Sequence, residues 1–319
     1  MKRFILRFCI WAFLALVICV TVIALGSDYQ KTLSLISSIS PEYLSLIIIS
    51  VLFNYALRFL KWQYYLKLLK ICISLKLSLW VFFSAFTMVL SPGKLGELVK
   101  SLLLKSRADI PVAETAPIVM AERVTDLLGM LLLCVIGFSQ TSFGGRPILI
   151  VGALIITGTY AITTEWFWNL VIRLANRIKA LEKLKDTFTM LQKSTQNLLS
   201  LKALAVTVPL STLSWAGEGV ALYLIFRSMG IDQPGLLGLS IFAHAFSSIA
   251  GAVSFLPGGL LITEGAMGAL FIYAQIPNEP AVSATFIIRA VTLWFAVLLG
   301  TIIFAIGHQA KDLEDLKNI

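Results

Sequence analysis

The chain has 319 residues, of which 58% are hydrophobic and only 13% are charged, and its formal net charge is +9. A soluble domain of this length carries far more charge, so the composition excludes a soluble class and indicates an integral membrane protein. The basic residues flank apolar runs instead of alternating with exposed aromatic residues, which argues against nucleic acid as a partner. Their placement is typical of topology signals and of contacts with anionic lipid headgroups at the cytoplasmic face.

The first two spans are expected near the N-terminus. Residues 8–25 form an apolar run that is longer than the hydrophobic part of a secretory signal peptide, so we expect a retained span at about 5–26. A second span is expected at about 41–60. The basic residues that follow it are interpreted as a cytoplasmic segment: Arg58, Lys61, Lys67 and Lys70.

Residues 77–104 form an apolar stretch that is broken at Pro92-Gly93. The arm after the break, 95–104, has ten residues and rises about 15 Å as a helix, which is half of a hydrocarbon core. Such an arm is too short to cross the membrane. Residues 77–104 are therefore predicted to form a re-entrant helical hairpin that enters and leaves on one side.

The rest of the chain contains further apolar runs of span length. Spans are predicted near 112–138, 147–167, 203–226 and 281–307. The basic, amphipathic stretch 169–202 is expected to lie on the cytoplasmic membrane surface. A second hairpin is expected over about 235–276, broken at Pro257-Gly258-Gly259, although its longer arms leave two full crossings open.

The arginines and lysines orient these spans. With both termini in the cytoplasm, most basic residues fall in or beside cytoplasmic segments, and only Lys31, Arg146 and Arg227 fall outside. Cytoplasmic loops of membrane proteins carry such an excess. We therefore expect an all-α polytopic protein of the cytoplasmic membrane, a single domain over 1–319, with about six transmembrane helices and two re-entrant helical hairpins.

The two broken segments share the spacing of their landmarks. Glu97 precedes Arg123 by 26 residues, and Glu264 precedes Arg289 by 25. A Pro-Gly break and a second proline precede each arginine in the same order. Chance matches of Pro-Gly are common, but four landmarks in one order and spacing indicate an internal repeat.

The repeats are assigned to residues 41–138 and 203–307. An odd number of predicted crossings separates the two copies, so the second is expected to be inverted relative to the first. Inverted repeats with broken helices that meet near the middle of the membrane are the architecture of many secondary transporters. The repeat is therefore the main physical argument in the sequence for transport.

Four motifs carry a resemblance to a known family: "SPGKLGELVKSLLL", "ERVTDLLGMLLL", "FLPGGLLITEGAMGALF" and "RAVTLW". They resemble the flippase-like lysylphosphatidylglycerol synthase transmembrane family over about residues 1–310. That family forms the membrane half of bacterial aminoacyl-phosphatidylglycerol synthases and includes free-standing members, some linked to dolichol-phosphate glycosylation. The family has a basic residue after the first Gly-Glu, which Lys100 supplies here. The soluble synthetase domain is not found in these 319 residues, so the resemblance implies translocation rather than lipid synthesis.

Charged residues at membrane depth are the candidate site, because each costs about 2.5–3.5 kcal/mol to insert unless it has a partner or a function. They are Glu97, Glu122, Arg123, Asp126, Glu218, Glu264 and Arg289. Arg123 and Arg289 are expected to hold a lipid phosphate through charge-assisted hydrogen bonds. Asp126 lies one helical turn from Arg123, so a purely structural ion pair stays open. His244 is expected to be a hydrogen-bonded core residue.

The breaks themselves add candidate binding groups. Gly258 and Gly259 allow close approach of the backbone to an anion, or they simply reverse the chain. Lys94 either supplements the first break or extends to the cytoplasmic surface. Glu97 and Glu264 have three readings: counter-ions of an arginine, ligands for a cationic headgroup, or carriers of a coupling proton.

Three functions are weighed. The first is a lipid flippase whose cargo is an anionic or aminoacylated phospholipid or a polyprenyl-phosphate-linked sugar. The second is a membrane-embedded glycosyltransferase that uses a polyprenyl-phosphate donor, which is disfavoured because the predicted outer loops are short and contain no Asp-x-Asp motif. The third is a non-transporting scaffold in a lipid pathway. A transporter rather than an enzyme is expected, with no metal or other cofactor, and homo-oligomerisation stays open.

Overall fold

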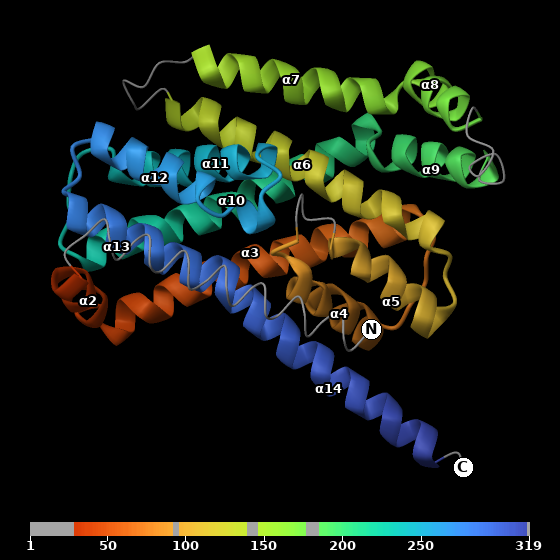
Figure 1. Cartoon of the computed structure of the whole chain (residues 1–319), viewed down its shortest axis with the longest axis horizontal. Helices are drawn as coiled ribbons and strands as arrows, with labels where there is room; N and C mark the ends of the chain where they lie inside the picture. The colour runs from red at the N-terminus through yellow and green to blue at the C-terminus, as the bar shows by residue number, and fades with distance from the viewer. Residues whose placement is uncertain (1–28, 92–95, 139–145, 177–184, 318–319) are drawn as a thin grey trace.

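The computed structural model describes residues 29–91, 96–138, 146–176 and 185–317, and every regular element in these ranges is a helix (Figure 1). In chain order the elements are α2 (Tyr29–Ser37), α3 (Pro41–Leu68), α4 (Leu75–Ser84), η1 (Ala85–Met88), α5 (Val99–Ala108), α6 (Val112–Phe138), α7 (Arg146–Thr163), α8 (Glu165–Asn176), α9 (Lys185–Leu198), α10 (Leu201–Ser228), α11 (Leu236–Val253), η4 (Pro257–Gly259), α12 (Ile262–Tyr273), α13 (Asn278–Arg289), η5 (Ala290–Trp294) and α14 (Phe295–Lys317).

The described helices confirm an all-α polytopic membrane protein. Three are long and apolar enough to cross a bilayer, and two strongly bent helix pairs raise the number of candidate spans to five. α6 has 27 residues, about 40 Å of helix, and is long enough as well, but it carries the charges of the candidate site. The predicted first span at 5–26 lies outside the described residues.

Serine caps begin three helices of the bundle. Ser40, Ser74 and Ser200 accept hydrogen bonds from the backbone N–H three residues on, at 3.4, 3.3 and 3.4 Å. Each bond satisfies a backbone donor that the first helical turn leaves without a partner. Pro41 follows Ser40 at the first helical position, where its missing N–H is harmless. These local signals set the starts of α3, α4 and α10.

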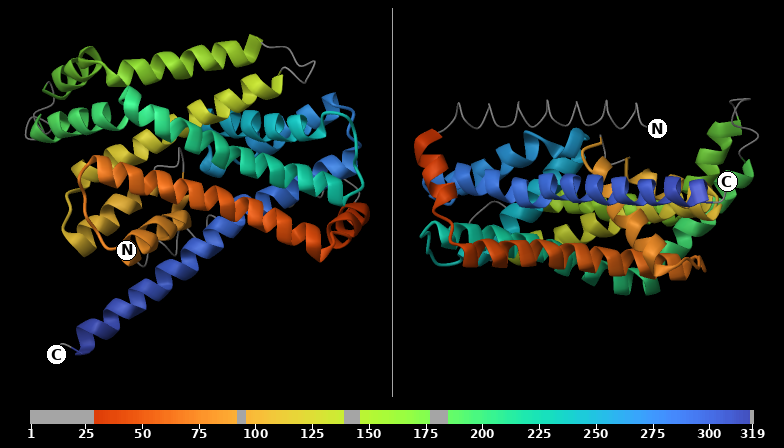
Figure 2. Two further views of the ribbon diagram at one scale, coloured as in Figure 1. Left: turned by 180° about the vertical axis from the view of Figure 1, so that it is seen from behind. Right: turned by 90° about the horizontal axis from the view of Figure 1, so that it is seen from below.

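The two broken segments approach the middle of the bundle from opposite ends. In Figure 1, α4 and α5 lie at the right-hand end, and α11 and α12 lie at the left-hand end. The long helices α3, α6 and α10 run between the two ends, and α3 and α10 lie side by side (Figure 2). This is the arrangement that an inverted repeat requires.

Each broken segment has one arm that is too short to cross the membrane. α5 has ten residues, and α12 has 12 residues, which rise about 18 Å, well short of a hydrocarbon core of about 30 Å. The length of α12 favours a re-entrant second hairpin over two full crossings. The ends of the two hairpins meet in an apolar cluster of Val89 and Leu90 with Leu260 and Leu293.

Many large apolar side chains are exposed on the outside of the bundle. Leu149, Leu154 and Tyr160 on α7, and Leu201 on α10, are all more than two thirds exposed. Such a surface is a liability in water, whereas in a bilayer it contacts lipid chains. The outer face of the bundle is therefore consistent with a membrane environment.

Two basic residues are buried, contrary to the sequence prediction. Arg58 and Lys61 were assigned to a cytoplasmic segment, but α3 continues to Leu68 and both side chains face the interior, with 9% and 1% exposure. That prediction was wrong because α3 continues as one helix through both residues to Leu68. The continuous helix places the two cations on the face that is covered by other helices of the bundle.

The stretch 169–202 is divided between two helices, and residues 177–184 lie outside the described part. α8 bends by 73° from α7, and α9 bends by 67° from α10. Thr195 and Leu198 of α9 are buried, and α9 packs against α6. The stretch is therefore anchored to one end of the bundle.

Candidate functional site

A cavity of about 260 Å³ lies between the ends of the two hairpins. Its charged and polar lining comes from every central helix: Tyr55 and Arg58 of α3, Arg123 and Asp126 of α6, Trp215 and Glu218 of α10, His244 and Ser248 of α11, Thr263 of α12, Arg289 of α13 and Thr292 of η5. Gly258 and Gly259 of η4 complete one wall. The cavity thus combines three arginines and two carboxylates in a chain that is otherwise apolar.

Arg289 connects three parts of the second repeat. Its Nε donates to Glu264 Oε1 at 2.6 Å, and its Nη2 donates to the carbonyl oxygen of Gly258 at 2.7 Å. The side chain therefore joins α13 to both α12 and the turn between the hairpin arms. A π-helical turn, Ala290–Trp294, follows directly, and such turns occur frequently at functional sites.

Arg123 occupies the corresponding place in the first repeat. Its Nη2 lies 3.0 Å from Glu97 Oε2 and 3.2 Å from Asp126 Oδ2. Arg58 Nη2 approaches the other oxygen of Glu97 at 3.7 Å. The Glu97–Arg123 pair thus matches the Glu264–Arg289 pair, which is the correspondence expected from the shared spacing.

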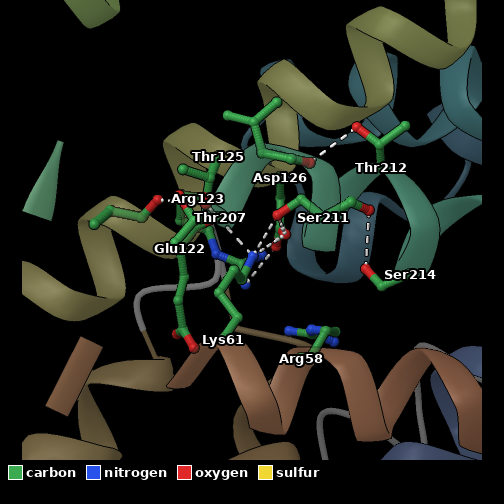
Figure 3. Close-up of polar contacts among 12 residues, drawn as sticks. Arg58, Lys61, Glu122, Arg123, Thr125, Asp126, Thr207, Ser211, Thr212 and Ser214 are labelled. Atoms are coloured by element: carbon green, nitrogen blue, oxygen red, sulfur yellow. Dashed lines mark hydrogen bonds and ion pairs between the residues drawn. The ribbon is translucent and has the colours of Figure 1, made fainter. Parts of the chain in front are cut away.

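Asp126 has a second cationic partner in Lys61. Figure 3 shows Lys61 extending from α3 toward Asp126 and Ser211. The Lys61 Nζ donates to Asp126 Oδ1 at 2.5 Å and to Ser211 Oγ at 2.7 Å, and Ser211 donates to the same carboxylate oxygen at 3.1 Å. Asp126 is therefore the centre of a buried network that joins α3, α6 and α10.

Lys100 and Glu122 form a separate buried pair. The Lys100 Nζ donates to Glu122 Oε2 at 2.6 Å and lies 5.0 Å from the ring centres of both Trp62 and Phe82. Neither residue of the pair lines the cavity. Lys100, the basic residue of the first motif, thus connects α5 to α6 and contributes to the packing of these two helices.

Glu218 and His244 form the fifth interior pair. The two side chains come from α10 and α11, and His244 Nε2 lies 2.8 Å from Glu218 Oε2. Both are buried, and both line the cavity. His244 is hydrogen-bonded as predicted, and its partner is a carboxylate.

The structure brings most of the predicted site residues together. Arg123, Asp126, Gly258, Gly259 and Arg289 line the cavity. Glu97 and Glu264 contact its arginines directly, which favours their reading as counter-ions. Lys94 lies outside the described residues.

Arg58 is the arginine of the cavity that the sequence interpretation places outside the membrane. It begins the run of basic residues at the end of the second span, which is typical of a cytoplasmic segment. A helical-face signal was present, since Tyr55, Arg58 and Lys61 recur every three residues and so share one face. Among the described residues, no group of histidine, cysteine or carboxylate side chains is placed to hold a metal ion.

Comparison with known proteins identifies the family. The profile of the lysylphosphatidylglycerol synthase TM region matches residues 9–300, which is most of the chain. The chain belongs to this family. No solved structure matches it.

The chain is also similar to curated membrane proteins of archaea. A UPF0104 membrane protein of Pyrococcus horikoshii is 25% identical over 91% of this chain and 96% of its own length. A UPF0104 membrane protein of Methanocaldococcus jannaschii is 27% identical over 72% of this chain and 97% of its own length. A third, from Methanothermobacter thermautotrophicus, is 26% identical over 70% of this chain and 71% of its own length.

Proposed function

We propose that this protein is a lipid transporter that moves a phosphate-containing headgroup through the arginine-lined cavity between its two hairpins. The observation that carries the proposal is the convergence of Arg58, Arg123 and Arg289 on one cavity in the middle of an apolar bundle. A guanidinium forms paired hydrogen bonds with phosphate oxygens. The family membership supports a membrane protein of lipid metabolism or transport.

The arginines have donors left for a ligand. Arg289 contacts Glu264 and Gly258 through Nε and Nη2, so the N–H groups of Nη1 are available. The Nε of Arg123 is buried and has no hydrogen-bond partner. A buried donor without a partner is costly, so a phosphate oxygen at this position would be stabilised.

The cavity wall is amphiphilic, as the cargo would be. Phe255 and Leu256 line the cavity and are exposed on the surface, beside exposed Leu261 and Ile262. A headgroup at the arginines would leave its acyl or polyprenyl chains against this apolar surface. An anionic phospholipid, an aminoacylated phospholipid and a polyprenyl-phosphate-linked sugar share this chemistry.

We place the protein in the cell membrane with both termini in the cytoplasm. The end of the bundle where α3 leads into α4 carries the exposed basic residues Lys67, Lys70, Lys76 and Lys105. At the opposite end, Arg227 pairs with Asp232, and Lys31 lies 3.7 Å from Glu279. A transporter is favoured over a glycosyltransferase because these outer carboxylates already have cationic partners.

Reconstitution tests the proposal. The purified protein is placed in liposomes that contain traces of fluorescent phosphatidylglycerol, its lysylated form or a polyprenyl-phosphate sugar, and quenching from outside measures the loss of inner-leaflet protection. We expect the wild type to move at least one of these lipids. The substitutions Arg123→Ala, Arg289→Ala and Glu264→Gln should each slow that movement about tenfold, which is about 1.4 kcal/mol.

Arg227→Ala is the matched control, since it removes an arginine that pairs with Asp232 away from the cavity. It should move lipid at the wild-type rate. Movement that survives all three cavity substitutions would contradict the site. Sugar transfer to an acceptor without any lipid movement would instead favour the transferase.

A further inference from the structure

The interior carboxylates differ in the kind of partner that they have. Within the described residues, Glu97, Glu122, Asp126 and Glu264 each lie within 4 Å of an arginine or lysine. Protonation of any of these would leave a buried cation without its counter-ion, which is strongly unfavourable. Glu218 differs, because its ion-pair partner is His244.

Histidine is the side chain that ordinarily changes its charge between about pH 5 and 8. His244 Nδ1 is buried and has no hydrogen-bond partner, whereas Nε2 contacts Glu218. The pair therefore has room for one exchangeable proton. With that proton the pair is neutral overall, and without it the pair carries one negative charge.

Within the part of the chain that the structure describes, a hydrogen bond joins Glu218 to His244, and the neighbouring groups have other partners or lie further away. On α3, Tyr55 donates its hydroxyl to the Thr292 carbonyl oxygen at 3.0 Å, and Arg58 interacts electrostatically with Glu218. On α10, the ring of Trp215 lies 6.0 Å from the His244 ring. The remaining charged groups of the cavity wall are Arg123 and Asp126 of α6 and Arg289 of α13.

Charge balance links this proton to the cargo. The described interior contains five ion-paired basic side chains, Arg58, Lys61, Lys100, Arg123 and Arg289, and five carboxylates, Glu97, Glu122, Asp126, Glu218 and Glu264. With His244 neutral, their charges sum to zero. A phosphodiester headgroup would add one negative charge to this balanced interior, and one proton on the Glu218–His244 pair would compensate it.

We infer that Glu218 and His244 form the binding site for one proton that is taken up together with an anionic phosphate headgroup. The inference rests on the proposed function for the identity of the cargo. It also points to an energy source, because a pH gradient drives the headgroup wherever the bound proton crosses the membrane with it. Binding of one linked proton changes headgroup affinity by at most about tenfold per pH unit, and the affinity increases as the pH falls.

Proton uptake on binding provides the test, and it does not depend on transport. Dihexanoyl-phosphatidylglycerol, a water-soluble short-chain lipid, is titrated calorimetrically into the purified protein in two buffers of different ionisation enthalpy. The difference between the two binding enthalpies gives the number of protons taken up. We expect measurable uptake, of at most one proton per lipid, for the wild type, and none for the double variant Glu218→Gln/His244→Gln.

Two further variants complete the test. His308→Gln removes the other histidine of the chain and should behave as the wild type. Glu218→Gln alone replaces the double variant in the test if the double variant fails to fold. This single variant should still bind the lipid but should take up no proton. Wild-type binding without proton uptake, or uptake that survives both Glu218 variants, overturns the inference while the proposed function stands. A wild type that binds no phosphate headgroup contradicts both.

The transport readout uses the same proteins in vesicles with fluorescent phosphatidylglycerol. An acidic pH on the side from which the lipid starts should accelerate its movement by the wild type and by His308→Gln. The double variant should move the lipid at a rate that does not respond to the gradient. A wild-type rate that ignores the gradient would overturn the inference.

Discussion

Arg289 shows how a permanently charged side chain is accommodated in a bundle of apolar helices. Its Nε donates to Glu264 at 2.6 Å, and its Nη2 donates to the carbonyl oxygen of Gly258 at 2.7 Å. The flat guanidinium reaches both acceptors at once, which a single ammonium group on a flexible stem does not reproduce. The geometry of the side chain, and not only its charge, therefore holds the second hairpin to α13.

This geometry predicts that Arg289→Lys is not a conservative change. The variant retains the positive charge but loses one of the two contacts, so we expect lipid movement in liposomes to slow about tenfold, or by about 1.4 kcal/mol. Lys202→Arg, the reverse exchange at an exposed position, is the control and should have no effect. A wild-type rate for Arg289→Lys would show that charge alone is sufficient.

The Lys100–Glu122 pair leads to a prediction about stability. Both side chains are nearly inaccessible, and their charged atoms lie 2.6 Å apart. Removal of one partner of a buried pair leaves the other without compensation, so Lys100→Met should destabilise the protein by about 3–5 kcal/mol. The double variant Lys100→Met/Glu122→Gln should recover most of this loss. Unfolding in detergent, followed by circular dichroism, measures both, and a double variant no more stable than Lys100→Met would contradict the pairing.

At the scale of elements, the turn of the second hairpin carries unusual backbone conformations. Gly258 has φ +60°, and the non-glycine residues Phe255 and Leu261 on either side have φ +55° and +70°. Such values are costly for residues with a side chain and concentrate at functional sites. The contacts of this turn with Arg289 and with Leu90 of the first hairpin maintain it.

The turn predicts a large difference between two glycine substitutions. An alanine at position 258 would have to keep the left-handed backbone of Gly258, and its methyl group would lie 2.6 Å from Leu90 Cδ2. Gly258→Ala should therefore lower the free energy of unfolding by about 1–2 kcal/mol. Gly265 lies within α12, where an added methyl group meets nothing within 4 Å. Gly265→Ala should therefore stabilise the helix by about 0.4–1 kcal/mol.

Thermal unfolding of the two glycine variants in the same detergent provides the comparison. Leu90→Ala removes the side chain that an alanine methyl group at position 258 would meet. The effect of Gly258→Ala in the Leu90→Ala background, relative to Leu90→Ala alone, therefore gives the cost of the left-handed backbone without the clash. Equal melting temperatures for Gly258→Ala and Gly265→Ala would show that the left-handed turn is not required for stability. The rates at which the same variants move fluorescent lipid in liposomes show whether the turn also determines the shape of the cavity.

The whole molecule is organised by two hairpins that enter from opposite ends and meet at one cavity. Helix pairs that bend by 73° and 67° place α8 and α9 at the same end as the first hairpin. The two ends of the bundle also differ in charge, with exposed lysines concentrated at the end that holds the first hairpin.

The charge difference predicts which end faces the cytoplasm. In a variant without the four native cysteines, Lys70→Cys and Asn278→Cys place single thiols at exposed positions on the two ends. Because basic loops stay in the cytoplasm, a membrane-impermeant maleimide should label only the Asn278→Cys variant in intact cells. Both variants should react after permeabilisation. Labelling of only the Lys70→Cys variant in intact cells would reverse the topology.

Local features of the sequence were sufficient for the class, the breaks and the paired landmarks. Apolar runs indicate membrane helices because hydrocarbon satisfies no backbone hydrogen bond, and Pro-Gly pairs interrupt helices wherever they occur. The matched spacing of Glu97 with Arg123 and of Glu264 with Arg289 marked two pairs that are in contact in the structure, and a counter-ion role was one of the alternatives for both carboxylates. These inferences depend only on residues near one another in the chain or on a repeated interval.

The identity of each buried partner depended on the tertiary structure. Arg58 and Lys61 face the interior because α3 continues as one helix to Leu68 and packs against α10, and hydropathy along the chain does not reveal which face is covered. Glu218 meets His244 because α10 and α11 lie side by side, although no interval in the sequence marks the pair. Counter-ions in a membrane interior are chosen by which helical faces meet, and that is a property of the packed bundle.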